Sequence, residues 1–224
     1  MKISEKTLSI LKNFSTINSG ICFKPGNTIS TVSPQKNILA DATIDENIPR
    51  EFCIFDLNNF ISALSISKGN GDLDFDDRSV VISDSDGSKI YYNYTTSSMV
   101  VGAPDKRPSL PSVDVEFVLS QDILDKILKC SSILGFPNIS IESDGESVCY
   151  RGYDVSNNSI HNYVKPISDV DPGGKKYKLI FRTENLKMFP ASYSVEISSR
   201  GIAKFTGVTE PLVYFVTIET SSEY

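Results

Sequence analysis

The sequence predicts an α+β fold made of two similar domains, each with helices on one face of an antiparallel sheet. Two observations support this fold. A helix pattern opens each half of the chain, and short β-patterned runs follow each helix in the same order. A helix that covers a sheet buries an apolar stripe and leaves its polar face for another contact.

Each predicted opening helix follows a serine that can cap a helix N-terminus with its side chain. After Ser4, the apolar positions recur at helical spacing, at Thr7, Leu8, Leu11 and Phe14. After Ser120 they recur in the same way, at Ile123, Leu124, Ile127 and Cys130. The two serines are 116 residues apart, so the same amphipathic helix is predicted to open both halves.

Runs rich in β-branched and aromatic residues, bounded by Gly, Pro, Asn or Asp, predict the strands. In the first half they cover residues 20–24, 28–32, 37–44 and 51–55. In the second half they cover residues 138–142, 147–152, 162–167 and 177–181. We expect these runs to form mainly antiparallel sheets.

Later segments of the two halves also match. A second helix is predicted over residues 57–65 and again over 184–189, with Phe55 and Phe181 at equivalent places 126 residues apart. Strands are predicted at residues 79–83 and 194–198, where Val80 and Val195 are 115 residues apart. Matches in the same order at a nearly constant offset indicate a tandem duplication.

A proline-containing segment without helical or strand periodicity separates the halves. Pro104, Pro108 and Pro111 favour an extended crossing segment over a flexible tether. We therefore predict a first domain over residues 1–98, an interdomain linker over residues 99–112 and a second domain over residues 113–224.

Composition excludes several classes of protein. The 224 residues are 40% hydrophobic and 22% charged, with a mean hydropathy of −0.12, as in a globular chain. No apolar run approaches the ~20 residues of a membrane span, and no signal-peptide pattern opens the chain, so membrane insertion and secretion are not expected. The net charge of −6 excludes a uniformly basic DNA-coating protein but leaves room for a locally basic face.

Residues suited to catalysis or metal binding are few and scattered. The one histidine, His161, lies in a polar stretch with no serine or cysteine motif beside it, which predicts a solvated surface position. The cysteines form no Cys-x-x-Cys pair and are predicted to be small buried hydrophobic side chains in a reducing setting: Cys22, Cys53, Cys130 and Cys149. We expect no catalytic residue, no metal, no cofactor and no enzymatic activity.

Six segments in order carry a further signal, namely residues 1–4, 11–21, 55–60, 100–106, 185–188 and 203–207. Together they resemble the sliding clamps, the DNA polymerase processivity factors, and specifically those of large tailed bacteriophages. The resemblance covers the whole chain and keeps the family's length. It implies a ring-shaped homotrimer with two similar domains per chain, in which helices line a central hole for duplex DNA and sheets form the outer surface.

The resemblance also implies two sets of site residues. Helix lysines would face the DNA: Lys6, Lys12, Lys126, Lys129 and Lys187. A hydrophobic pocket beside the linker would hold a partner peptide, formed by Val100, Val101, Ala103 and Pro104 with Val32 and Ile38 as its floor. Each set has an ordinary alternative, because surface helices carry solvated lysines in many proteins and valines pack in any core.

The implied function is to encircle duplex DNA without sequence preference and to tether the replicative DNA polymerase. The implied partners are that polymerase and an ATP-dependent clamp loader, in the host cytoplasm during infection. The main alternative is a β-rich structural or virion assembly protein, since much of the chain is short strands and turns. We further expect subunit contacts near residues 79–83 or 206–208 and a frayed tail at residues 221–224.

Overall fold

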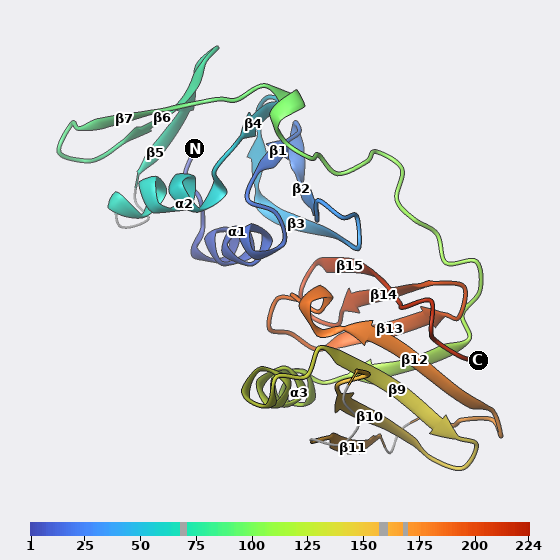
Figure 1. Ribbon diagram of the computed structural model, residues 1–224. Helices are drawn as coiled ribbons and strands as arrows, with labels where there is room; N and C mark the ends of the chain where they lie inside the picture. Colours follow the sequence, from blue (N-terminus) through green and yellow to red (C-terminus); the bar gives the residue numbers. More distant parts are fainter. Residues whose placement is uncertain (68–70, 157–160, 168–169) are drawn as a thin grey trace. The chain divides into compact units, whose positions relative to one another are not determined.

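The computed structural model describes residues 1–67, 71–156, 161–167 and 170–224, which divide into unit 1, Met1–Arg107, and unit 2, Pro108–Tyr224 (Figure 1). The division falls inside the segment predicted as the linker. The predicted domain limits at residues 98 and 113 remain predictions.

Unit 1 contains two helices, α1 (Glu5–Ile17) and α2 (Leu57–Ile66), and the short 3-10 helix η1 (Ser97–Met99) among its described residues. Its strands are β1 (Ile21–Phe23), β2 (Gly26–Val32), β3 (Ile38–Ile48), β4 (Phe52–Ile54), β5 (Asp72–Phe75), β6 (Ser79–Ser83) and β7 (Lys89–Asn93). All pairings are antiparallel: β1 with β4, β2 with β3, and β6 between β5 and β7. Helices α1 and α2 lie side by side (Figure 1).

Unit 2 contains one α-helix in its described part, α3 (Gln121–Leu134), and the 3-10 helix η2 (Thr183–Asn185). Its strands are β8 (Val115–Leu119), β9 (Asn138–Asp144), β10 (Val148–Tyr153), β11 (Tyr163–Ile167), β12 (Lys176–Arg182), β13 (Tyr193–Ser198), β14 (Ile202–Gly207) and β15 (Leu212–Thr217). They pair antiparallel in the orders β11-β10-β9-β12 and β8-β13-β14-β15. Helix α3 packs against β10.

The N-terminus of α1 is bonded to a buried carboxylate on β3. The Ser4 hydroxyl accepts a hydrogen bond from the Thr7 amide at 3.2 Å, as a helix cap does. Glu46, only 8% exposed, accepts from the Thr7 hydroxyl at 2.6 Å and from the Ser4 amide. These bonds and the burial of Ile10, Leu11 and Phe14 fix the rotation of α1, so its polar face points outward.

Helix α2 is capped in the same way, but the predicted cap of α3 is wrong, because the Ser120 side chain makes no capping hydrogen bond. The Asp56 carboxylate caps α2 by accepting from the Asn59 amide at 2.9 Å, and α2 buries an apolar stripe that includes Phe60 and Leu64. Helix α3 buries Leu124 and Ile127 and ends at Gly135, whose φ of 69° suits glycine. No helix within the described residues is long and apolar enough to cross a bilayer.

The helix predicted over residues 184–189 is wrong. Only the three-residue η2 forms there, and the chain continues without regular structure to Pro190. Leu186 and Met188 are buried while Lys187 between them is exposed, which is a period of two rather than the period of a helix. Pro190 also disfavours a helical conformation at the residue before it.

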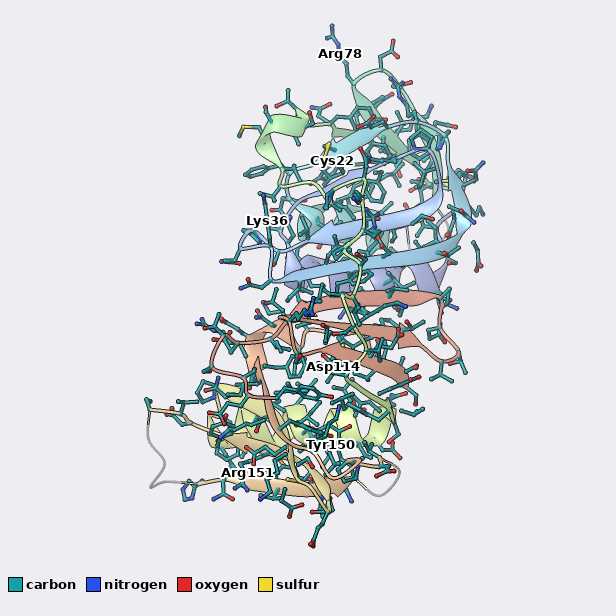
Figure 2. All side chains as sticks on the ribbon, turned by 90° about the vertical axis from the view of Figure 1, so that its right-hand side faces the viewer. Cys22, Lys36, Arg78, Asp114, Tyr150 and Arg151 are labelled. Carbon is teal, nitrogen blue, oxygen red and sulfur yellow. A yellow bond between two sulfur atoms is a disulfide. The ribbon has the colours of Figure 1, made fainter. Side chains whose placement is uncertain are left out.

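The prediction that all cysteines are reduced is wrong as well. Cys22 and Cys53 face each other across β1 and β4 and form a disulfide, with their Cα atoms 4.0 Å apart (Figure 2 labels Cys22, with sulfur in yellow). Direct opposition on antiparallel strands creates this pairing, and sequence spacing does not reveal it. Cys130 and Cys149 are free and half-buried.

The C-terminal tail is ordered, contrary to the prediction of fraying. Lys178 on β12 exchanges backbone hydrogen bonds with Glu223, at 2.8 and 2.9 Å. The Tyr224 ring stacks on Tyr177, and its hydroxyl accepts from Lys175 Nζ at 2.6 Å. An edge strand and an aromatic partner therefore hold the tail to unit 2.

The start of unit 2 is held by a small network around Asp114 (labelled in Figure 2). Its carboxylate accepts from the Ser199 amide at 2.8 Å and from the Ser112 hydroxyl at 2.9 Å. Burial raises the pKa of Asp114, but these hydrogen bonds outweigh burial, and the net pKa is below its ordinary value.

The strands predicted to make subunit contacts are interior strands. Residues 79–83 form β6, which pairs on both sides with β5 and β7, and β14, which ends at Gly207, pairs with β13 and β15. Neither has a free edge. Within the described part of the chain, β7 and β11 each pair on one side only.

Glu46 provides a test of the contact between α1 and β3. Burial raises its pKa, but the hydrogen bonds from Thr7 and Ser4 outweigh burial, so the pKa lies below its ordinary 4.5. We expect Glu46→Ala to lower the free energy of unfolding by about 1–3 kcal/mol at pH 7, because it removes a carboxylate that buried donors need. Chemical unfolding of both proteins across a pH series measures this difference.

The pH dependence has a defined sign. When the pKa of a carboxylate is lower in the folded protein than in the unfolded chain, the carboxylate stabilises the folded protein fully at pH values above the unfolded-state pKa. This stabilisation is lost as the pH falls through the folded-state pKa. The difference between wild type and Glu46→Ala should therefore shrink below pH 4.5. Asp45→Ala, an exposed neighbour on β3, is the control and should change stability little. Equal effects of both substitutions would contradict the assigned role of Glu46.

Candidate functional site

The outward faces of α1 and α3 carry four of the five lysines that the sequence assigned to DNA. Lys6 and Lys12 are exposed on α1. Lys126 and Lys129 are exposed on α3, one helical turn apart. Each pair is presented by a helix whose apolar side is buried in its own unit.

These faces are only weakly basic. On α3, Asp122 precedes Lys126 by four residues and Asp125 precedes Lys129 by four, a spacing at which opposite charges attract. Together α1 and α3 expose four lysines and three carboxylates, the third being Glu5. On α2 the exposed polar residues are all neutral: Asn58, Asn59, Ser62 and Ser65. The helix faces can therefore attract phosphates, but only weakly.

Lys187 lies elsewhere. It is exposed but follows η2 instead of occupying a helix, because the predicted fourth helix does not form. It lines a cavity of about 980 Å³ in unit 2, together with Leu128, Phe136 and Leu186. Its place in the fold thus differs from that of the four helix lysines.

A pocket of about 360 Å³ lies beside the linker, entirely within unit 1. We call it the linker pocket; it is lined by Cys22, Lys24, Pro25, Thr28, Ser30, Glu51, Ser97, Val100, Gly102, Ala103, Asp105 and Arg107. One side of the lining comes from β1, β2 and the turn between them, with Glu51 from just before β4, and the other side comes from residues 97–107. The linker segment therefore forms one wall of this pocket.

Arg107 fastens that wall to the sheet. Its Nε donates to Asp41 Oδ2 at 2.6 Å, its Nη2 donates to the Ser30 hydroxyl at 2.8 Å, and its Nη1 donates to the Pro104 carbonyl. A guanidinium suits this role because its donors lie in a fixed planar arrangement. The linker up to residue 107 is thus attached to β2 and β3.

Two further contacts hold the linker. Lys24 pairs with Asp105, and its hydrogen bond and charge lower the pKa of that carboxyl. The Asn18 side-chain amide donates to the Val32 carbonyl at 2.9 Å and to the Val101 carbonyl at 3.0 Å. Asn18 thereby joins the C-terminal end of α1 to β2 and the linker.

The structure separates the six residues that the sequence assigned to the peptide pocket. Val100 and Ala103 line the linker pocket. Val32 and Ile38 are 4% and 2% exposed and belong to the core of unit 1. Val101 and Pro104 are exposed and lie outside the lining.

Sequence reasoning missed the polar part of the lining, above all Lys24, Asp105 and Arg107. The sequence offered one signal for this part of the lining, the basic pair Lys106-Arg107 between two prolines. Prolines stiffen the segment, so a charged side chain there can reach only a few neighbouring groups.

Comparison with known proteins identifies the family. A family model described as DNA polymerase processivity factor matches residues 2–101, and one described as gp45 sliding clamp, C terminal, matches residues 116–220. The sliding clamp of Vibrio phage KVP40 is 30% identical over 223 residues, covering 98% of this chain and 99% of that protein. The chain belongs to the sliding clamp family. The sliding clamp of Enterobacteria phage T4 is also 30% identical, covering 100% of this chain and 99% of its own.

Solved structures show the sliding clamp fold. PCNA from A. fulgidus, solved with the C-terminal region of FEN-1 bound, has a TM-score of 0.70 at 13% identity, covering 99% of this chain and 98% of that one. PCNA from Thermococcus kodakaraensis has a TM-score of 0.69 at 11% identity, covering 96% of both chains. The predicted α+β fold with two similar domains and the resemblance to phage sliding clamps are both confirmed. The alternative of a virion structural protein is set aside.

Proposed function

We propose that three copies of this sliding clamp close into a ring around duplex DNA and tether the replicative DNA polymerase of a phage in the host cytoplasm. The observation that carries the proposal is the family match along the whole chain, in which two similar units each turn the polar face of a helix outward. An ATP-dependent clamp loader would place the ring on DNA. The clamp itself would act without catalysis, as a topological tether.

Two unpaired sheet edges support the ring. The edge strand β7 carries Tyr91, 63% exposed, and Ile66 at the end of α2 is 67% exposed. In unit 2 the edge strand β11 carries Val164, 42% exposed, and Ile133 near the end of α3 is 71% exposed. Pairing β7 of one chain with β11 of the next would give the backbone N–H and C=O groups of both edges hydrogen-bond partners and would cover these side chains. Because this contact joins different surfaces of the two chains, repeating it can close a ring.

The ring can be tested by mass. We expect light scattering to give 74.1 kDa, three chains of 24.7 kDa. Tyr91→Lys or Val164→Lys should shift the mass toward 24.7 kDa, because a buried unpaired charge opposes association. Val113→Lys changes a valine of similar exposure outside both edges and should leave the mass at 74.1 kDa. A trimer that tolerates both edge substitutions would rule out this pairing.

Weakly basic helix faces suit a ring that slides. If topology holds the ring on DNA, phosphate contacts need only be weak and independent of sequence. Lys6, Lys12, Lys126 and Lys129 would supply these contacts, with Asn58, Asn59 and Ser62 as neutral donors, and Lys187 would contribute from outside the helices.

Reversing helix charges tests the DNA-facing surface. We expect Lys12→Glu with Lys129→Glu to reduce loading of the ring onto DNA and processive synthesis. Two positive charges per chain become negative and repel the DNA phosphates. Folding stability should change by only about 0.5 kcal/mol or less, since both side chains are exposed. Lys36→Glu with Lys176→Glu, which lie on no helix, is the matched control and should preserve processivity.

Whether the closed ring itself holds the protein on DNA can be measured separately. Rings loaded on closed circular DNA should survive high salt that removes protein from linearised DNA, because release from a circle requires ring opening. Equal loss from both DNAs would mean that binding is electrostatic and that the chain does not act as a topological clamp.

The linker pocket is the proposed docking site of the polymerase. Val100 and Ala103 provide apolar contact, while Lys24, Glu51 and Arg107 at its polar side can orient a bound segment. In this proposal Val101 and Pro104 lie next to the bound segment, and Val32 and Ile38 support the pocket from the core.

A single substitution tests the docking site. Val100→Asp should weaken binding of the phage's own DNA polymerase by about tenfold or more, because a charge is desolvated in an apolar contact. Val113→Asp is the matched control outside the pocket, and both variants should keep the trimer mass. Wild-type affinity for Val100→Asp would place docking elsewhere.

A further inference from the structure

The disulfide between Cys22 and Cys53 joins two very short strands. Strands β1 and β4 are three residues each, and the cysteines form the middle pair between Ile21–Ile54 and Phe23–Phe52. A two-stranded ladder of this length is marginal without other support. The covalent bond therefore fixes a pairing that backbone hydrogen bonds hold only weakly.

Both cysteines are connected to the linker pocket. Cys22 lines the pocket. The Cys53 carbonyl accepts from the Thr95 amide at 2.9 Å, where the chain turns toward Ser97 and Val100 of the opposite wall. Gly20, next to β1, lies so close to Val100 that a Cβ on the glycine would be 3.1 Å from Val100 Cγ1. Loosening β1 from β4 would thus let the β1 wall move against the linker wall, which Arg107 holds to β2 and β3.

We propose that the Cys22–Cys53 pair is a redox-sensitive clasp that sets the affinity of the linker pocket for its partner. The disulfide form holds the walls in the geometry described above, and the dithiol form lets them separate. The disulfide form binds more tightly, because a preorganised pocket loses less conformational entropy on binding. This inference rests on the proposed docking of the polymerase at that pocket.

A thiol reagent can reach the clasp through the pocket. Cys22 is half-buried and lines the pocket, whereas Cys53 is 4% exposed. A thiolate of a dithiol attacks Cys22 Sγ, forming a mixed disulfide, and the Cys53 sulfur leaves and takes up a proton. The second thiol of the reagent then displaces the Cys22 sulfur, which also takes up a proton. The protein gains two electrons and two protons, and the reagent becomes a cyclic disulfide.

Thermodynamic linkage makes the coupling between disulfide and binding reciprocal. If the disulfide form binds the polymerase more tightly, bound polymerase must favour the disulfide by the same factor. A polymerase segment in the pocket also covers the side from which a reagent attacks Cys22. Bound polymerase should therefore slow reduction of the pair.

The first experiment counts thiols without reference to function. Full-length clamp is denatured and alkylated before and after treatment with dithiothreitol, and mass spectrometry assigns each modified cysteine. We expect only Cys130 and Cys149 to react before reduction and Cys22 and Cys53 to join them afterwards. Four reactive cysteines in protein purified and oxidised with glutathione disulfide would overturn the proposal.

The second experiment measures affinity for the DNA polymerase of the same phage. Reduction should weaken binding by about threefold to tenfold, the scale expected when a pocket loses preorganisation. The double variant Cys22→Ser with Cys53→Ser should bind as weakly as the reduced protein, and dithiothreitol should not change its affinity. Cys130→Ser with Cys149→Ser, the matched control, should keep the full redox response.

The outcomes separate the two proposals. Equal affinity in both redox states, with the thiol counts as expected, would overturn the redox clasp and leave the docking site intact. If Val100→Asp has no effect or the polymerase binds neither form, the docking proposal fails and the clasp fails with it. Weaker binding after reduction, with protection of Cys22 by bound polymerase, supports the clasp.

Discussion

The burial of one apolar stripe per helix is the constraint on which the rest of this structure depends. Ile10, Leu11 and Phe14 can leave water only if α1 lies on the strands of its unit, and that choice also fixes which residues face outward. The Glu46 carboxylate sets the rotation further by bonding the first turn of the helix to β3. The lysines of α1 are therefore positioned by hydrophobic contacts on the opposite side of the helix.

The same constraint explains where the two units differ. In unit 1 the chain after β4 has apolar residues at helical spacing, including Leu57, Phe60 and Leu64, and α2 packs beside α1. In unit 2 the chain after β12 alternates buried Leu186 and Met188 with exposed Lys187, so it follows the period of extended chain. A cavity beside α3 accompanies the missing helix.

Features that depend on local periodicity could be predicted from the sequence, and features that depend on register could not. The cap at Ser4 and the buried faces of α1 and α2 follow from spacing, whereas the cap predicted at Ser120 does not form. The disulfide needs Cys22 opposite Cys53, and the linker pocket needs Arg107 folded back onto Asp41, 66 residues earlier in the chain. Hydrophobicity selected Val100 and Ala103, which line the linker pocket, and also Val32 and Ile38, which lie in the core, since buried core and pocket lining share the same composition.

The anchoring of the linker limits its backbone freedom. Arg107 fastens one end to unit 1, and Ser112 and Asp114 are bonded within unit 2. Only residues 108–111 remain between these attachments, and Pro108 and Pro111 restrict two of the four backbone φ angles. The segment that joins the two attachments therefore has few backbone angles that can change. Its own conformational entropy is low, whichever unit it is counted with.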